Sequence, residues 1–250
     1  MIQRIKALSV AVAVALTQYG CGSGEVDMVR SAPLADYQGF YTNIEPDGSI
    51  LSTAIFDDGS LYAISFDKEG KEFHALRGTV EGSNGNLFAS DIIGYSFNGL
   101  RPVRGQLSGT YRAKQSLSGQ VTYSETGRIM PVSVTYDPRY EDTPTLANAA
   151  GVYSGLAVGE SERGQANVSI TPQGAVEISG PNDCRAAGGI TPKKTGNAYD
   201  ITVRYGQIAS CSLSGQVMTG SVVIEAETGH LNALATSADR THPLLFTGGK

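Results

Sequence analysis

From residue 40 onward, the chain consists of short runs in which apolar and polar positions alternate, separated by turn residues. The segment 132–136 is typical, because two valines and a tyrosine alternate with a serine and a threonine, the period-two pattern of a half-buried strand. Asp58-Gly59 and Asn84-Gly85 each stand between two such runs. These pairs favour tight hairpins, since glycine accepts a positive φ without a steric clash. The pattern therefore predicts an all-β fold.

The runs predict short antiparallel strands along both halves of the chain. In the first half the expected strands are 40–44, 50–56, 61–66, 74–81, 86–92, 105–111, 117–123 and 129–136. In the second half they are 166–170, 175–178, 198–205, 213–225, 231–236 and 244–246. About seven or eight such strands per half suit a barrel or a sandwich, and a closed barrel leaves no exposed strand edge. We therefore expect small antiparallel meander barrels, with sandwiches as the alternative.

Two short sequence motifs occur twice, and in the same order each time. Leu-Ala, three residues and Gly-x-Tyr occur at 34–41 and again at 146–153, at an offset of 112. Ser-Leu-Ser-Gly-Gln-Val occurs at 116–121 and again at 212–217, at an offset of 96. The two recurrences indicate an internal duplication; two similar hairpins within one continuous barrel are the alternative.

A duplicated unit of about 100 residues has an ordinary domain size. We therefore expect two tandem domains, one over 33–142 and one over 143–250. A short helical turn is expected at the start of the second domain, with Thr143 as its N-cap and Pro144 at its first helical position.

The segment 137–142, just before this boundary, is charged and contains one tyrosine. We expect it to be a solvated linker between the domains. The alternative is that Arg139 and Tyr140 form a binding anchor, because arginine and tyrosine are enriched at such anchors.

The N-terminus has the pattern of an export signal. Arg4 and Lys6 precede the apolar segment 7–16, which is long enough for a signal peptide but shorter than the roughly 20 residues of a membrane-spanning helix. No later segment has the length and apolarity of a transmembrane helix. We expect residues 1–20 to be removed on export.

Cys21 follows Gly20 at the end of this leader and resembles the acylated first residue of a bacterial lipoprotein. Acylation there implies a membrane anchor, since several acyl chains hold a protein stably where one does not. The flexible segment 21–32 would then be a lipidated linker. The alternative is cleavage further upstream, for instance after Thr17, which leaves a free thiol. By the same resemblance Gly22, in place of an aspartate, implies the outer membrane.

If Cys21 carries lipid, two cysteines remain, Cys184 and Cys211. An even pair in an oxidising compartment predicts a disulfide bond. A loop of this length would contribute about 3–4 kcal/mol of stability in a chain-entropy estimate. The alternative of a redox or metal pair lacks a Cys-x-x-Cys spacing and a nearby histidine.

The charge balance limits the partners. The chain carries 19 basic and 24 acidic residues, and without the leader the balance is 17 to 24, a net charge of −7. A mildly acidic protein without basic runs argues against nucleic acid and against direct adhesion to anionic lipid.

No pattern of catalytic residues is present in the sequence. Neither His-Glu-x-x-His nor Gly-x-Ser-x-Gly occurs, and the only histidines are His74, His230 and His242. Asp47 and the pair Asp57-Asp58 are interpreted as turn residues that cap their own backbone. We therefore expect no enzymatic activity, no metal site and no cofactor.

Gly39-Phe40-Tyr41 and Gly151-Val152-Tyr153 open the two repeats. This opening resembles the Gly-x-Trp that begins lipocalin-like barrels, with tyrosine in place of tryptophan. More broadly, the chain resembles proteobacterial lipoproteins of uncharacterised role that are built from small β-barrels. The resemblance implies an envelope protein that binds a protein or a small ligand without catalysis. The alternative is a structural or assembly lipoprotein whose partner is another outer-membrane component.

Overall fold

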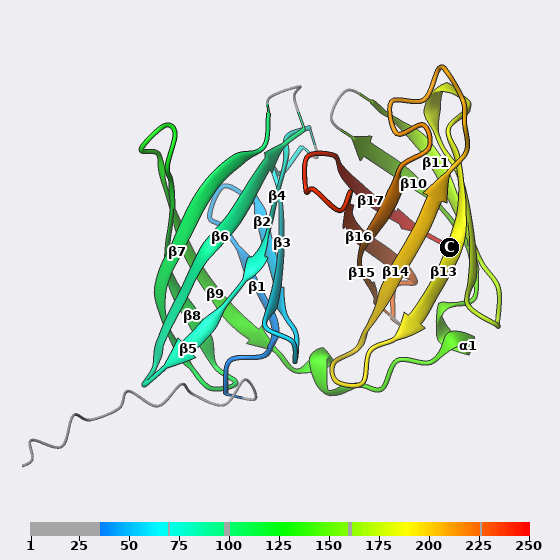
Figure 1. Ribbon diagram of the computed structural model, residues 1–250. Helices are drawn as coiled ribbons and strands as arrows, with labels where there is room; N and C mark the ends of the chain where they lie inside the picture. Colours follow the sequence, from blue (N-terminus) through cyan, green and yellow to red (C-terminus); the bar gives the residue numbers. More distant parts are fainter. Residues whose placement is uncertain (1–35, 70, 98–100, 160–161, 226) are drawn as a thin grey trace, which may run out of the picture.

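The computed structural model describes residues 36–250 except 70, 98–100, 160–161 and 226. The strands form two closed antiparallel barrels of eight strands each, arranged in tandem and lying side by side (Figure 1). The expected all-β tandem fold is confirmed, and the architecture is a barrel rather than a sandwich. No helix among the described residues has the length and apolarity to span a bilayer.

The first barrel, called barrel 1 below, is an up-and-down meander. Its strands are β1 (Gly39–Ile44), β2 (Ile50–Ile55), β3 (Ser60–Phe66), β4 (Phe73–Thr79), β5 (Glu81–Ser83), β6 (Asn86–Ser96), β7 (Val103–Arg112), β8 (Ser116–Tyr123) and β9 (Ile129–Asp137). β5 continues the line of β4, and both pair with β6. Pairing of β1 with β9 completes the ring.

The second barrel, called barrel 2 below, repeats this meander. Its strands are β10 (Gly151–Gly159), β11 (Arg163–Ile170), β12 (Ala175–Ser179), β13 (Arg185–Pro192), β14 (Ala198–Tyr205), β15 (Val217–Glu225), β16 (His230–Thr236) and β17 (Pro243–Gly249). Each strand pairs with its sequence neighbour, and β10 pairs with β17 to close the barrel.

Two features of barrel 2 differ from the sequence-based expectation. Strand β13 was not predicted, because its sequence is rich in alanine and glycine. Gly188 on this strand has a packing reason: a Cβ atom there would lie 2.0 Å from the carbonyl oxygen of Thr202 on β14. The expected strand 213–225 begins only at Val217, since residues 206–216 form a loop of turns.

The two sequence recurrences have different outcomes. Gly39 and Gly151 both begin the first strand of a barrel, so the first recurrence marks equivalent positions. The second recurrence does not, because 116–121 lies within β8 whereas 212–216 lies in the loop before β15 and only Val217 belongs to that strand. The duplication is therefore visible in the strand order and at the first strand of each barrel. The repeated Ser-Leu-Ser-Gly-Gln-Val motif does not mark equivalent positions and is not part of it.

The connection between the barrels is anchored by a few buried residues, although most of its residues are exposed as a solvated linker would be. It contains the 3-10 helix η2 (Pro138–Glu141) and the one-turn helix α1 (Leu146–Ala149). Tyr140 is only 4% exposed, and its ring meets that of Phe40 edge to face at 5.1 Å. The N-cap of α1 is Thr145, whose side chain accepts a hydrogen bond from the Asn148 amide, and not Thr143 as expected.

The barrels contact each other through outward-facing side chains of β3, β4 and β6 on one side and of β10, β15, β16 and β17 on the other. Phe73 packs with Val158 and Leu245, while Ala75 and Tyr95 pack with Leu234. These contacts bury apolar surface of both barrels and fix one barrel against the other.

Polar bonds surround these apolar contacts. Arg77 of β4 donates hydrogen bonds to the carbonyl oxygen of Thr219 and to the hydroxyl group of Thr236. In the turn before β17, Arg240 forms an ion pair with Asp91 of β6 at 3.1 Å. Arg240 has a positive φ of 59°, and its ion pair makes this turn a connection between the two barrels.

Candidate functional site

Barrel 1 contains a cavity of about 350 Å³ that opens at one end. The cavity is lined by the inward-facing side chains of seven strands, with a mainly apolar wall that includes Leu51, Ala63, Leu76, Val103 and Met130. Its volume lies within the range of about 300–1,000 Å³ that is usual for ligand pockets.

The opposite end of barrel 1 is closed. Leu51, Ala63 and Leu76 also line a deeper space of only about 30 Å³, so the interior narrows away from the mouth. Beyond it, the rings of Tyr37 and Tyr111 lie 5.3 Å apart and cover the end of the barrel. Barrel 1 is therefore a cup, with one entrance.

Charged and polar side chains surround the entrance of this cup. They are Ser65, Glu72, His74, Ser96, Arg101, Thr126 and Arg128. Burial lowers the pKa of His74 below its ordinary value, and the nearby Arg128 lowers it further, while Glu72 acts in the opposite direction. With His74 neutral, the two guanidinium groups outnumber the one carboxylate at the entrance.

Barrel 2 is filled by its own side chains. The spaces within it amount to about 20 Å³ and about 30 Å³, and large side chains such as Met218, Leu231 and Phe246 occupy the centre. At the end next to α1, the hydroxyl group of Tyr199 donates a hydrogen bond to the carbonyl oxygen of Thr145 at 2.8 Å.

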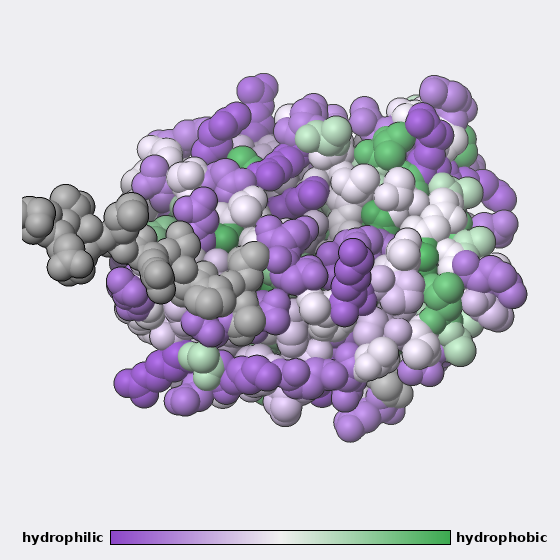
Figure 2. All heavy atoms as spheres, turned by 60° about the horizontal axis from the view of Figure 1, so that its bottom comes forward, coloured by the Kyte–Doolittle hydropathy of each residue, from purple (hydrophilic) through white to green (hydrophobic). Residues whose placement is uncertain are grey.

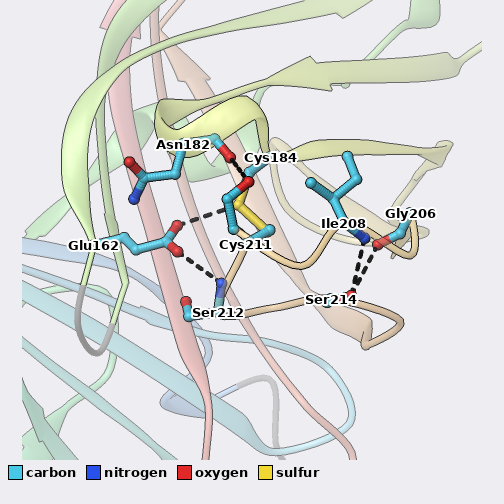
Figure 3. The surroundings of a disulfide bond; sticks show 9 residues. Glu162, Asn182, Cys184, Gly206, Ile208, Cys211, Ser212 and Ser214 are labelled. Atoms are coloured by element: carbon cyan, nitrogen blue, oxygen red, sulfur yellow. Dashed lines mark hydrogen bonds between the residues drawn. A yellow bond between two sulfur atoms is a disulfide. The ribbon is translucent and has the colours of Figure 1, made fainter.

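The other end of barrel 2 is capped by the loop 206–216, which lies on the same side of the molecule as the entrance of barrel 1 (Figure 1). Leu213 of this loop is 4% exposed and packs into the core. A disulfide bond joins Cys211 of the loop to Cys184, with the Cα atoms 5.0 Å apart (Figure 3). The predicted disulfide is thus present, and it fastens the loop that closes the barrel.

Glu162 lies beside this disulfide. One of its carboxylate oxygens accepts a hydrogen bond from the Ser212 amide at 2.7 Å, and the other lies 3.2 Å from the sulfur of Cys184 (Figure 3). The carboxylate and the two sulfurs have the proximity of a metal-ligand group. Disulfide sulfurs are not thiolates, however, so this cluster stabilises the loop and does not offer a zinc-type ligand set.

A cleft of about 130 Å³ lies between the barrels. One wall is the outer face of β1, β2 and β3, and the other is formed mainly by β15 and β16. Residues of the connection, including Asp137 and Arg139, border it as well. Burial raises the pKa of Asp137, but hydrogen bonds from Arg139 outweigh this and hold the pKa below its ordinary value.

The surface away from these cavities has no dominant apolar area on the face seen in Figure 2. Hydrophobic residues lie scattered among hydrophilic ones, most of them over barrel 2 (Figure 2). Single apolar residues scattered over a surface are normal, whereas contiguous patches mark interfaces.

The structure places the other predicted residues as follows. Cys21, the predicted lipidation site, lies outside the described residues. Asp47 and Asp58 accept hydrogen bonds from Ser49 and Ser60 in their own turns, as their interpretation as capping residues predicts. Among the histidines, His74 lines the cup, and the ring of His230 bonds with Thr247 at 2.8 Å.

Apart from Arg139, which was considered as part of a binding anchor and borders the cleft, sequence reasoning did not identify the residues that line the cup and the cleft. These residues come from many strands, and the strand register decides which of their side chains face the same cavity. Short sequence motifs do not reveal that register. Comparison of the chain with models of known families and with curated proteins finds no match. The cavities themselves are therefore the main guide to function.

Proposed function

We propose that the protein is a lipid-anchored binding module of the bacterial envelope, without catalytic activity, and that the cup of barrel 1 holds its ligand. The observation that carries this proposal is the difference between the two barrels. Barrel 1 has a cavity of about 350 Å³ with an entrance, whereas barrel 2 has the same strand order and is filled. Eight-stranded barrels either are filled by side chains or hold one small ligand.

The lining of the cup suggests the chemistry of this ligand. The deep wall is apolar, and Arg101 and Arg128 lie at the entrance. A small apolar molecule with an anionic end would bury its body in the cup and place its charge near the guanidinium groups, where charge-assisted hydrogen bonds are strong.

Binding can be tested with anilinonaphthalene sulfonate, an apolar fluorophore with one negative charge. The probe is titrated into residues 21–250, the chain expected after removal of the leader, with the substitution Cys21→Ser. This protein lacks the acylation site and needs no detergent. We expect saturable binding that Ser65→Phe abolishes, because Ser65 of β3 lines the cup.

The matched control is Ser52→Phe on the neighbouring strand β2, which makes the same change on the outer face of the barrel. Loss of binding in Ser65→Phe alone would support the cup as the site. Equal binding by both variants, or no saturable binding by the parent chain, would refute it and favour a structural or assembly role.

The anchor and the location form a separate part of the proposal. They rest on the apolar leader and on Cys21 at its end. We expect radiolabelled palmitate to be incorporated into the wild-type chain and not into Cys21→Ser, and the wild-type chain to fractionate with the outer membrane. A Cys21→Ser chain that remains with the membrane would contradict this anchor. Protease treatment of intact cells would then distinguish the cell surface from the periplasmic face.

A further inference from the structure

We propose that the cleft between the barrels is a second binding site, selective for a small ammonium ion with an apolar body. This site is separate from the cup of barrel 1, with which it shares no lining residue. Its existence depends on the tandem arrangement, because each barrel contributes only one wall.

The cleft has the size and the walls for a compact apolar group. Its volume of about 130 Å³ is close to that of an engineered cavity of about 150 Å³ that holds benzene. The wall from barrel 1 carries aromatic and aliphatic side chains, namely Phe40, Phe56, Tyr62, Ile64 and Phe66. Val223 and Leu234 face them from barrel 2.

Two buried polar atoms in the opposite wall have no partner. Among the described residues, the hydroxyl oxygen of Ser221 and the amide oxygen of Asn232 are buried and make no hydrogen bond. Ser221 is only 5% exposed. Because Val223 lies opposite Asn232 and Ser221 lies opposite Leu234, the two polar side chains are diagonal neighbours on the outer face of β15 and β16.

These two atoms point to a ligand that donates hydrogen bonds. Buried polar groups in proteins are almost always hydrogen-bonded, so an unpaired pair facing one cleft requires an explanation. The amide oxygen of Asn232 can only accept, and the hydroxyl group of Ser221 can accept as well. A primary ammonium group carries several donors and could satisfy both atoms.

The charges at the border of the cleft favour a cation. Its lining includes four carboxylates, which belong to Asp137, Asp142, Glu225 and Glu227, and one guanidinium group, that of Arg139. Arg139 already binds Asp137 through its Nε atom at 2.9 Å and lies 3.6 Å from Glu225. The border therefore has an excess of negative charge, which attracts an ammonium ion and repels a carboxylate.

The protein already places one ammonium group, that of Lys193, against an aromatic ring of the cleft wall. The Nζ atom of Lys193 lies 4.3 Å from the centre of the Phe56 ring, the geometry of a cation–π contact. Its charge is compensated by Asp200 at 2.5 Å, so it does not cancel the carboxylates of the cleft.

The test uses 2-phenylethylammonium as the probe and the full exported chain carrying Cys21→Ser. Binding is followed by chemical-shift changes in NMR spectra, with 3-phenylpropionate as the anionic counterpart of the same shape. Because the carboxylate has the chemistry proposed for the ligand of the cup, the two probes are compared in the Ser65→Phe chain, whose cup is filled. There we expect the ammonium ion to bind with a Kd in the range of about 1 mM or below and the carboxylate to bind at least about tenfold more weakly.

Two variants locate the binding. Ser52→Phe, which fills the cleft, should abolish it, and Ser65→Phe, which fills the cup, should leave it unchanged. The double variant Glu225→Gln and Glu227→Gln should weaken it by about tenfold if the carboxylates contribute the expected attraction. Near-ultraviolet circular dichroism verifies that each variant is folded.

Three results would overturn this inference. They are the absence of ammonium binding at about 10 mM probe, equal binding of the carboxylate by the Ser65→Phe chain, and loss of ammonium binding in Ser65→Phe instead of Ser52→Phe. The first two leave the cup proposal intact, because its test uses an anionic probe and the parent cup. The third would place the ammonium ion in the cup, and the titration with anilinonaphthalene sulfonate would still decide separately whether the cup binds an anion.

Discussion

The hydroxyl group of Tyr41 donates a hydrogen bond to the carbonyl oxygen of Tyr37, four residues earlier, at 2.9 Å. The same bond occurs in barrel 2, where Tyr153 donates to the carbonyl oxygen of Ala149 at 2.8 Å. Both tyrosines are fully buried, and each fixes the entry of the chain into the first strand of its barrel. The tyrosine of the repeated Gly-x-Tyr word therefore serves the same purpose twice.

Replacing either tyrosine by phenylalanine should lower the free energy of unfolding by about 1–2 kcal/mol, because a buried carbonyl group loses its partner. Chemical denaturation of Tyr41→Phe and Tyr153→Phe measures the effect. Tyr111→Phe is the matched control. Its hydroxyl group makes no hydrogen bond among the described residues, and its ring packs against that of Tyr37 with or without the hydroxyl group. A control as unstable as the two variants would refute this role.

Because of the disulfide bond, we expect the stability of the protein to depend on redox conditions. Cys184 and Cys211 are 27 residues apart, and closing a loop of this size contributes about 3–4 kcal/mol in a chain-entropy estimate. A reductant should therefore lower the Tm of the wild-type chain, and it should leave the Tm of Cys184→Ser/Cys211→Ser unchanged. If reductant shifted both transitions equally, the disulfide would not be the cause.

Because Arg77 links the two barrels, we expect an energetic coupling between them. Arg77 of barrel 1 donates to the hydroxyl group of Thr236, which is completely buried in barrel 2. A double-mutant cycle of Arg77→Met and Thr236→Val should give a coupling energy above about 0.5 kcal/mol, the range of residues in direct contact. The exposed Arg112→Met serves as control and should show no coupling to Thr236→Val.

His74 predicts a pH dependence at the entrance of the cup. Its pKa in the folded protein lies below the ordinary value, so the unfolded chain binds more protons in the window just below about pH 6.5. Stability should therefore fall as the pH decreases from 7 through this window, and His74→Gln should remove that part of the loss. Thermal unfolding at several pH values measures it; an identical slope in His74→Gln would contradict the prediction.

Several elements were accessible from the sequence because their causes are local. The Asp58-Gly59 hairpin forms between β2 and β3 as predicted, since glycine at φ 77° is a local backbone requirement. The strand over 198–205 matches β14 because its apolar and polar positions alternate. Strand β13 was missed for the converse reason: its alanines and glycines carry no alternation, and only the adjacent strand explains them.

The connection between the barrels shows the limit of local reasoning. Its charged composition predicts solvent exposure, yet Tyr140 is buried between Phe40 of barrel 1 and Ala198 of barrel 2. A tyrosine in a charged segment has no local signal for burial, because the surface that covers it is distant in the chain.

The all-β class, the tandem meander, the tyrosine that opens each barrel and the pairing of Cys184 with Cys211 were predictable from the amino-acid sequence alone. These follow from side-chain periodicity, turn chemistry and cysteine number, which act over short distances or by elimination. The three-dimensional fold was needed to find that barrel 1 is hollow and barrel 2 filled, and that Ser221 and Asn232 face a cleft between them. Those properties depend on how side chains from many strands share one interior or one interface, and strand register sets that arrangement.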